Sequence, residues 1–343
     1  MEAAQMGPTI VPYRNAHEAV QKPDIATDLA DALIRSPINV RAPLGTYPDD
    51  MDRLRMGGYE DPTVWEEVMK RAYIEAKTDA ELAQLLKTHY LQDDVAASFA
   101  AYRNSGVTEE VDELLKRLGV CRQTPIADVG CGRGHAAHAM FKLGYENMTA
   151  MDPNDKWYTG TGYLQSLPDH TIHVVNSLDE WDQLGGRFGA IISCSTVHHW
   201  HHIPQMAIGT RRAMQPGGYW LMMAEYFANS ARELVDGLNS HPTATRYGSY
   251  EWAYPASAYV DLLQSSGFVL VGVIPLSYKG AVFFSGCQLP VDNQHDEWVD
   301  NHLTETEGTV EAFWSEVDGW RRGTTATRNY TIPQVLVFQR VQP

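Results

Sequence analysis

The chain has little cysteine, no long apolar run and no basic cluster. Its four cysteines among 343 residues form no C-x-x-C pair, which argues against a disulfide scaffold and a cysteine-based zinc site. The longest apolar run, Phe268 to Ile274, is far shorter than the ~20 residues that span a bilayer. The first residues carry no secretory signal. We therefore expect a soluble, cytoplasmic protein without a membrane partner.

Positive charge is also scarce. Acidic residues outnumber basic ones by 43 to 27, which gives a formal net charge of −16. A chain with this charge repels phosphate backbones, and a nucleic-acid binder would need a basic stripe that is missing here. The apolar share of 44% is enough for a sizeable core. These values predict a globular protein without a nucleic-acid partner.

Two regions differ in their pattern. Residues 1–120 predict a helical N-terminal region that covers a substrate pocket or supports a homodimer. Its expected elements are a helix over 24–35, a loop over 36–60, and helices from Pro62, over about 79–88 and 93–103, and from a Thr108 cap. Over 121–343, apolar runs alternate with helical stretches. The runs are 125–129, 148–152, 171–175, 188–194, 217–224, 267–274 and 332–341, the last after an insertion at about 279–330. This alternation predicts an α/β, Rossmann-like, mainly parallel sheet flanked by helices.

A glycine-rich turn follows the first of these strands. The strand leads directly into Gly130, Gly132 and Gly134, where a ligand can approach a backbone that has no Cβ atoms. The G-x-G-x-G spacing differs from the G-x-G-x-x-G of dinucleotide sites. Asp128 stands where an acid would face a cation rather than a pyrophosphate. Asp152, 18 residues after Gly134, occupies the usual position of an acid that binds ribose hydroxyls.

The segment from about 124 to 275 contains these residues, and through them it resembles class I S-adenosylmethionine-dependent methyltransferases of the small-molecule type. The run from Asp128 to Gly134 is similar to their D-x-G-x-G-x-G turn around the aminocarboxypropyl end of the cofactor. Gln215-Pro216-Gly217-Gly218 is similar to their L-x-P-G-G turn. The resemblance implies S-adenosylmethionine as the cofactor. The cofactor-binding residues that we expect are Asp128, Gly130, Gly132, Gly134, Asp152, Pro153, Asn176, Ser177, Leu178, Ser195 and Tyr102.

Two of these expectations, the adenine contact and the contact of Tyr102, do not come from the glycine turn or from Asp152. The family usually carries an acid after the third strand, which meets the adenine amino group. Ser177 takes that place here, so Asn176, Ser177 and the backbone of Leu178 are the adenine candidates. Tyr102 precedes the core on a helix that, in similar proteins, covers the cofactor.

A histidine-rich loop follows the fourth strand, in the run Ser195-Thr196-Val197-His198-His199-Trp200-His201-His202. Ligands bind beyond the carboxyl ends of parallel strands, so this loop should lie near the transferred methyl group. The run resembles the H-D-W segment of plant-type O-methyltransferases. The resemblance gives His198 the role of the base, whereas His199 replaces the companion acid.

The candidate catalytic residues are therefore His198, His199 and Glu225, which follows the fifth strand. Pocket lining and an ordinary surface loop are the alternatives for the histidines. Histidines together with Glu225 could also hold a metal. Adjacent histidines on a loop rarely aim at one point, so we predict no metal.

The sequence thus predicts methyl transfer from S-adenosylmethionine to a small-molecule acceptor. Oxygen is the favoured acceptor atom, and nitrogen and carbon stay open. Two other classes remain as alternatives. One is an NAD-dependent oxidoreductase on a similar sheet, and the other is a catalytically silent methyltransferase-like binding subunit.

Overall fold

A computed structural model describes residues 62–200, 202–228, 231–241, 243–247, 251, 253–275, 282–283 and 333–341. The helix expected over 24–35, the loop over 36–60 and nearly all of the expected insertion lie outside these residues. The helices are α3 (Pro62–Ala76), α4 (Ala80–Thr88), α5 (Val95–Arg103), α6 (Val107–Arg117), α7 (His135–Lys142), α8 (Gly162–Ser166), α9 (Leu178–Asp182), the 3-10 helix η3 (Val197–His199), α10 (Ile203–Ala213), α11 (Ala231–Ser240), α12 (Ala244–Tyr247) and α13 (Ala256–Ser265). The strands are β1 (Ile126–Val129), β2 (Met148–Met151), β3 (His173–Val175), β4 (Phe188–Cys194), β5 (Met214–Met223), β6 (Phe268–Pro275), β7 (Val282–Phe283) and β8 (Pro333–Arg340).

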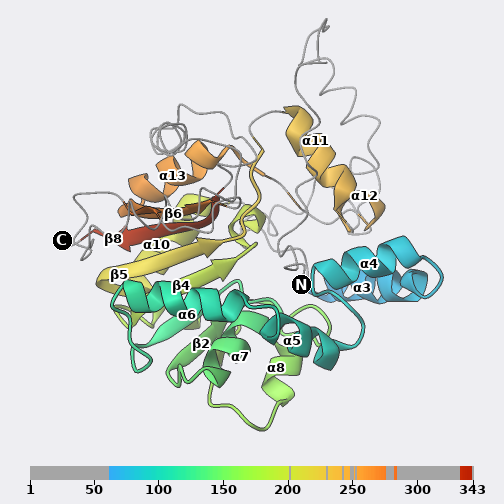
Figure 1. Cartoon of the computed structure of the whole chain (residues 1–343), viewed down its shortest axis with the longest axis horizontal. Coiled ribbons are helices and arrows are strands. Elements are labelled where there is room, and N and C mark those ends of the chain that lie inside the picture. The colour runs from blue at the N-terminus through green and yellow to red at the C-terminus, as the bar shows by residue number, and fades with distance from the viewer. Residues whose placement is uncertain are drawn as a thin grey trace, which may run out of the picture.

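The described strands form one mixed sheet in the order β3-β2-β1-β4-β5-β8-β6-β7 (Figure 1). The pairs from β3 through to β5 are parallel, whereas β8 runs antiparallel to both β5 and β6. The strand order reverses between β1 and β4, and open α/β sheets bind their ligands at the carboxyl ends beside such a point. The predicted Rossmann-like fold is confirmed.

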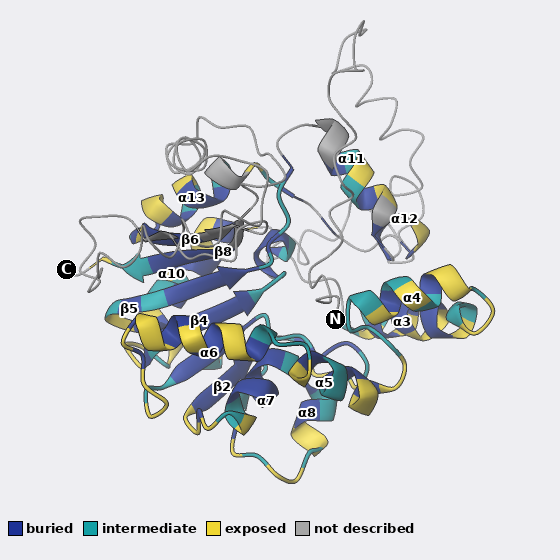
Figure 2. Cartoon of the chain, in the orientation of Figure 1, coloured by how far each residue is buried: buried dark blue, intermediate teal, exposed yellow. Residues whose placement is uncertain are grey.

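Both faces of the sheet are buried, because helices pack on each of them. Successive side chains of a strand point to opposite faces. Ile191 and Ile192 of β4 accordingly join two different apolar clusters. The Ile191 cluster includes side chains of α9, α10 and α13, and the Ile192 cluster includes side chains of α5, α6 and α7. Figure 2 shows the buried strands between helices whose outer faces are exposed. This two-sided burial explains the nearly continuous apolar runs of the sequence.

Helices α5 and α6 belong to the same packed unit as the sheet. Phe99 of α5 and Leu115 of α6 lie in the apolar cluster that also contains Ile126 of β1. The boundary expected at residue 120 therefore divides a shared core. Helix α6 begins at Val107 with Gly106 as its N-cap at φ +86°, so the expected cap at Thr108 is wrong. Thr108 is instead a buried residue inside the first turn.

The glycines expected as a turn before the fifth strand lie inside it. Strand β5 already begins at Met214, and Gly217 adopts φ +77°. The register between β4 and β5 shifts between Phe188 and Ala190, next to this irregular stretch. The Gly217 conformation is in the left-handed region, which glycine enters without steric cost. The run from Gln215 to Gly218, which resembles the L-x-P-G-G turn, is thus a distortion at the start of β5 rather than a separate loop.

Helices α3 and α4 have a small core of their own. It contains Met69, Tyr73 and Leu86 from these two helices and Tyr247 from α12. The Tyr247 hydroxyl donates a hydrogen bond to Glu75 Oε2 at 2.6 Å, and Arg246 pairs with Asp79 at 2.9 Å. Helix α12 is therefore fastened to the N-terminal helices.

Candidate active site

The three glycines of the turn after β1 have positive φ angles of +67°, +52° and +84° at Gly130, Gly132 and Gly134. A Cβ atom at Gly130 would lie 2.0 Å from Thr196 Oγ1, and one at Gly134 would lie 2.5 Å from Leu164 Cδ2. A Cβ atom at Gly132 would meet no atom within 4 Å. The outer glycines are therefore required by packing, whereas the middle one faces open space that a ligand can use.

Asp152 lies directly against this turn. Its buried carboxylate accepts the N–H of Gly132 at 2.7 Å and the N–H of Asn154 at 2.9 Å. Pro153 follows it and is partly buried. Carboxylate oxygens keep further lone pairs when each accepts one bond. Ribose binding by Asp152 stays a prediction, and this geometry is compatible with it.

Asp128 has one carboxylate oxygen without a hydrogen-bond partner among the described residues. Oδ2 accepts the N–H of Ala137 at 3.1 Å, whereas the buried Oδ1 atom accepts none. Burial raises the pKa of Asp128 to about 7, with a further contribution from the charge of Asp152. An unpartnered buried oxygen costs free energy that a cationic ligand group would recover. The amino group of S-adenosylmethionine is such a group, so the turn fits this cofactor.

The Asp128 geometry predicts pH-dependent cofactor binding. The folded-state pKa lies above the ordinary value of 3.8, so ionising this carboxyl disfavours folding as the pH rises through about 7. A bound ammonium group favours the ionised form. Affinity for S-adenosylhomocysteine should therefore weaken as the pH falls below 7, by at most about tenfold per pH unit. Calorimetric titration measures this slope. Asp128→Asn should flatten it, and an unchanged slope in that variant would contradict the assignment.

The three adenine candidates are used in different ways. Asn176 donates both amide hydrogens within the protein, to Asp152 O at 2.6 Å and to Thr161 Oγ1 at 2.8 Å. Ser177 caps α9 by accepting the N–H of Asp179 at 3.2 Å, and Leu178 begins that helix. Asn176 therefore supports the end of β2, and its contact with adenine stays a prediction. The contacts of Ser177 and Leu178 stay predictions.

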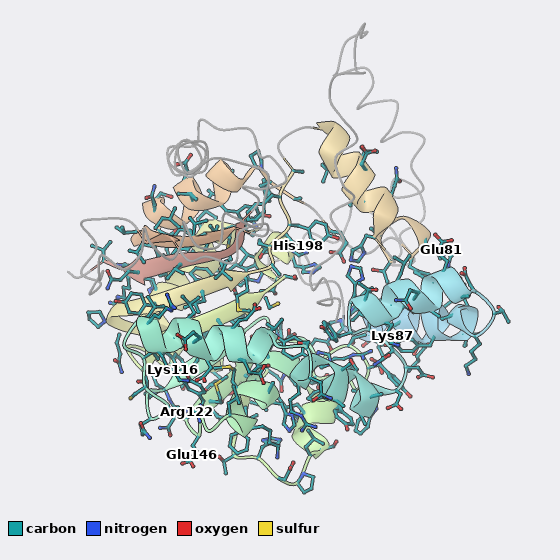
Figure 3. The ribbon with its side chains drawn as sticks, in the orientation of Figure 1. Glu81, Lys87, Lys116, Arg122, Glu146 and His198 are labelled. Atoms are coloured by element: carbon teal, nitrogen blue, oxygen red, sulfur yellow. The ribbon has the colours of Figure 1, made fainter. Side chains whose placement is uncertain are left out.

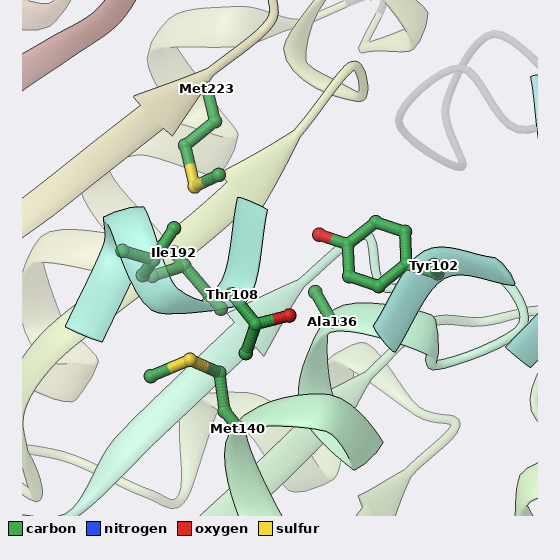
Figure 4. Close-up of a pocket in the computed structure, with 7 residues that line it drawn as sticks. Tyr102, Thr108, Ala136, Met140, Ile192 and Met223 are labelled. Carbon is green, nitrogen blue, oxygen red and sulfur yellow. The ribbon is translucent and has the colours of Figure 1, made fainter. Parts of the chain in front are cut away.

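Tyr102 of α5 lies against the start of α7. Its ring stacks on His135 with 5.7 Å between centroids, and burial raises the pKa of its hydroxyl. Figure 4 shows Tyr102 at the edge of a small cavity of about 10 Å³. That volume is close to the minimum for one water molecule, so the cavity is too small to hold part of a cofactor. A covering role for Tyr102 stays a prediction.

The ends of β4 and β5 turn toward each other. Ser195 and Ala224 directly follow these strands, and both adopt left-handed conformations, at φ +47° and +46°. The Ser195 hydroxyl donates to Ala224 O at 2.7 Å. Left-handed residues other than glycine cost about 1–3 kcal/mol each and gather at functional sites. The two bends bring η3 and Glu225 together. Ser195 therefore shapes this junction, and its cofactor contact stays a prediction.

His198 lies between two buried glutamates, near the ends of β4 and β5 (Figure 3). Its Nδ1 atom is hydrogen-bonded to Glu225, and its Nε2 atom lies 3.1 Å from Glu251 Oε2. Glu225 also accepts the backbone N–H groups of Val197 at 2.9 Å, His198 at 3.2 Å and Tyr226 at 3.2 Å. The Glu225 carboxylate therefore fixes both the ring of His198 and the loop that carries it.

This environment determines the charge of His198. Burial alone would lower its pKa, but the charges and hydrogen bonds of Glu225 and Glu251 outweigh burial and raise it to about 9. Both imidazole nitrogens face carboxylates, which favour the protonated ring. The role of His198 as the base stays a prediction.

Two further histidines face Glu251. His199 Nε2 lies 3.6 Å from Glu251 Oε2, and His241 Nε2 lies 3.7 Å from Glu251 Oε1. We call His198, His199, Glu225, His241 and Glu251 the His–Glu cluster. No motif marks His241 or Glu251 as catalytic. The sequence places them only in an aromatic, polar stretch before α13 that could cover the substrate or pack as an ordinary loop.

The other members of the histidine run lie elsewhere. Trp200 is fully buried in the apolar core, with its ring 5.9 Å from that of Trp220. It therefore packs as a core residue, which weakens the likeness to the H-D-W segment. His202 is exposed at the start of α10, and His201 lies outside the described residues.

The His–Glu cluster adjoins the glycine turn. Thr196, two residues before His198, occupies the space next to Gly130. The Cys194 thiol lies close enough to both sites that burial, then the charge of Asp128 and then that of Glu225 raise its pKa to about 12. A ligand in the turn and a second molecule at the cluster would therefore be neighbours, as a two-substrate transfer requires.

The N-terminal helices are fastened to the glycine turn through Arg133. This buried guanidinium donates to the carbonyl oxygens of Tyr158 at 2.6 Å and Gln92 at 2.9 Å and to the hydroxyl of Tyr73 on α3. Glu66, also on α3, accepts the N–H of Tyr158 at 3.1 Å. Helix α3 and the turn are thus held by one polar network.

A strand order that reverses beside a glycine turn, with an acid after β2, defines a nucleotide-type cofactor site on a Rossmann-like sheet. Residues 99–273, just over half of the chain, match the methyltransferase domain family, and the chain belongs to this family. It is an S-adenosylmethionine-dependent methyltransferase of class I fold. The alternative of an NAD-dependent oxidoreductase is therefore set aside.

Solved structures give more distant likenesses. A methyltransferase described as putative, from Bacillus halodurans, is 14% identical, with 68% of this chain and 100% of that chain covered and a TM-score of 0.42. The 1,6-didemethyltoxoflavin-N1-methyltransferase of Burkholderia thailandensis is 12% identical, with 83% and 92% covered and a TM-score of 0.41. No curated protein gave a significant match. Within the described residues, no helix has the length and apolar character needed to cross a membrane. The family assignment comes from the domain match alone.

Proposed function

We propose that this methyltransferase modifies a small-molecule acceptor, with oxygen as the favoured atom. The observation that carries this proposal is the His–Glu cluster, which lies at the ends of β4 and β5 beside the glycine turn. A hydroxyl acceptor must lose its proton during transfer, and adjacent carboxylates and imidazoles can receive one. The net charge of −16 disfavours a nucleic-acid acceptor. The four cysteines, none of them in a C-x-x-C pair, favour a cytoplasmic location.

Each side of the site has its own task. Asp128 would bind the cofactor's ammonium group, the open space at Gly132 would admit the cofactor, and Asp152 would bind the ribose. When bound, the cofactor supplies a methyl group on a positively charged sulfur. Within the His–Glu cluster, the partly exposed imidazole of His199 would receive the proton that a hydroxyl acceptor loses.

The N-terminal helices would form one wall of the acceptor site. The Tyr247–Glu75 and Arg246–Asp79 pairs tie α3 and α4 to α12, which lies between His241 and Glu251 in the chain. These pairs support a covering role for the N-terminal region, because an α/β sheet alone leaves its strand ends open. A homodimer through the same region is the alternative, and sedimentation velocity separates the two.

The test is a search for the methylated product. The purified protein is incubated with S-adenosylmethionine and separate pools of hydroxyl, amine and carbon-acid small molecules, with RNA and denatured protein as further acceptors. We expect mass spectrometry to show the gain of one CH₂ unit on a hydroxyl compound, with equal formation of S-adenosylhomocysteine. Gly132→Val serves as the inactive control. Methylation confined to RNA or protein, or no turnover with any pool, would overturn the proposal; the latter would favour a silent binding subunit.

A further inference from the structure

We propose that His198, His199 and Glu251 bind a divalent transition metal of the zinc class. One ring nitrogen from each histidine and one carboxylate oxygen of Glu251 all lie within 4.8 Å of one another. Glu251 Oε2 lies 3.1 Å from His198 Nε2 and 3.6 Å from His199 Nε2. Two ligands of a tetrahedral zinc ion with bonds of about 2.0–2.1 Å are roughly 3.3 Å apart. The two measured separations lie on either side of that value.

The surroundings of His198 leave room for a cation. Its Nδ1 atom bonds to Glu225, so an Nδ1–H donated to that carboxylate would leave a lone pair on Nε2 directed at Glu251. A lone pair and a carboxylate facing each other at 3.1 Å repel unless a proton or a metal lies between them. A proton can bridge only His198 and Glu251. A metal ion between the three residues would bind His199 as well.

Charge balance also favours a divalent ion. Glu225 and Glu251 are both buried, so together they bring two negative charges into the interior. Negative charge in the interior is costly unless cations or hydrogen-bond donors face it. A divalent ion with neutral histidines balances both carboxylates.

The two other cluster residues, Glu225 and His241, are placed to orient the proposed metal ligands. Metal-binding histidines almost always donate their second N–H to a carboxylate or carbonyl, and Glu225 takes this part for His198. His241 Nδ1 accepts the backbone N–H of Thr243 at 3.3 Å, so the ring proton lies on Nε2, which faces the second oxygen of Glu251. That arrangement leaves Glu251 Oε2 to the metal.

Three protein ligands leave a fourth tetrahedral position open, and this is the pattern of catalytic rather than structural zinc sites. The open position would take the oxygen of the acceptor, and a metal lowers the pKa of an oxygen that it binds. This use of the metal depends on the proposed methyl transfer to oxygen, whereas the metal site itself does not. This proposal departs from the expectation of no metal, which considered Glu225 as the carboxylate ligand and not Glu251, 53 residues from His198 in the chain.

Zinc binding tests the proposal directly, with untagged protein. We expect about one Zn²⁺ per chain by calorimetric titration and by elemental analysis after dialysis, and no matching heat with Mg²⁺, which prefers oxygen ligands. Glu251→Gln and His199→Ala should each abolish stoichiometric binding. Glu225→Gln should weaken it by about 10–100-fold, as the loss of a supporting group does. His199 is partly exposed, so its variant tests the site even if Glu251→Gln fails to fold.

The matched control is Glu180→Gln. Glu180 lies 3.2 Å from His173 in an exposed pair that has no third ligand in the described residues, so its loss should leave zinc binding unchanged. The absence of stoichiometric Zn²⁺, or equal binding by wild type, Glu251→Gln and His199→Ala, would overturn the site. Removal of zinc by a chelator should lower turnover of a hydroxyl acceptor without changing affinity for S-adenosylhomocysteine. Stoichiometric zinc with unchanged turnover would retain the site but overturn its role toward the acceptor.

Discussion

Replacing Gly132 by valine will abolish measurable binding of S-adenosylhomocysteine while the protein remains folded. A Cβ atom at this position meets no protein atom within 4 Å, so the new side chain would enter only the space that we assign to the cofactor. The backbone at φ +52° adds strain of about 1–3 kcal/mol, which a folded domain of this size can tolerate. Calorimetric titration should show at least a 100-fold loss of affinity, a change of about 2.7 kcal/mol.

Gly186→Val is the matched control for the strain. Gly186 also has a positive φ, +67°, and open space around its Cβ position. It precedes β4 and therefore lies at the amino ends of the parallel strands, away from the glycine turn at their carboxyl ends. Its valine variant should lose similar stability and keep the affinity of the parent. If both variants lost affinity equally, or if Gly132→Val kept it, the cofactor would not occupy the space at Gly132.

Arg133→Ala should lower the free energy of unfolding by about 3–5 kcal/mol. The side chain is buried, and its removal leaves the carbonyl oxygens of Tyr158 and Gln92 and the hydroxyl of Tyr73 without their shared donor. Arg133→Lys should recover only part of the loss, because an ammonium group cannot reproduce the planar fork of donors. The midpoint and slope of urea unfolding measure the change.

Arg117→Ala is the control for arginine loss. Arg117 is exposed and lies 3.3 Å from Glu113 one helical turn away, a pair that contributes no more than about 0.5 kcal/mol. An equal effect of the two alanine variants would show that the Arg133 network does not hold the N-terminal helices on the glycine turn. Arg133→Ala should also make residues 62–88 more susceptible to limited proteolysis, because Arg133 holds these helices on the glycine turn.

The parts of the fold that local sequence determines were predictable. Apolar runs gave the strands, and three alternate glycines after β1 gave the cofactor turn, because strand burial and backbone freedom act over a few neighbouring residues. The meeting of His198 and Glu225 could be foreseen as well, since both follow parallel strands of one sheet. Each of these features could be predicted from residues that are close together in the sequence or that follow adjacent strands.

The partners that come from distant segments were not predictable. Glu251 lies 53 residues from His198 in the chain, and no spacing in the sequence records their contact. The sequence also did not indicate that Asn176 donates to the carbonyl oxygen of Asp152 and the hydroxyl of Thr161. His198 was expected to be neutral because an isolated histidine titrates near neutrality, whereas two buried carboxylates raise the pKa of this one to about 9.

The central claim, that the glycine turn binds S-adenosylmethionine, is tested most directly by ligand-dependent thermal unfolding of the unaltered chain. A ligand that binds only the folded state stabilises it by about 2.7 kcal/mol at 100 times its Kd. We predict that S-adenosylmethionine and S-adenosylhomocysteine each raise the unfolding temperature in a concentration-dependent manner, and that NAD does not. An unfolding temperature that neither sulfur ligand changes, or that NAD raises equally, would contradict the account.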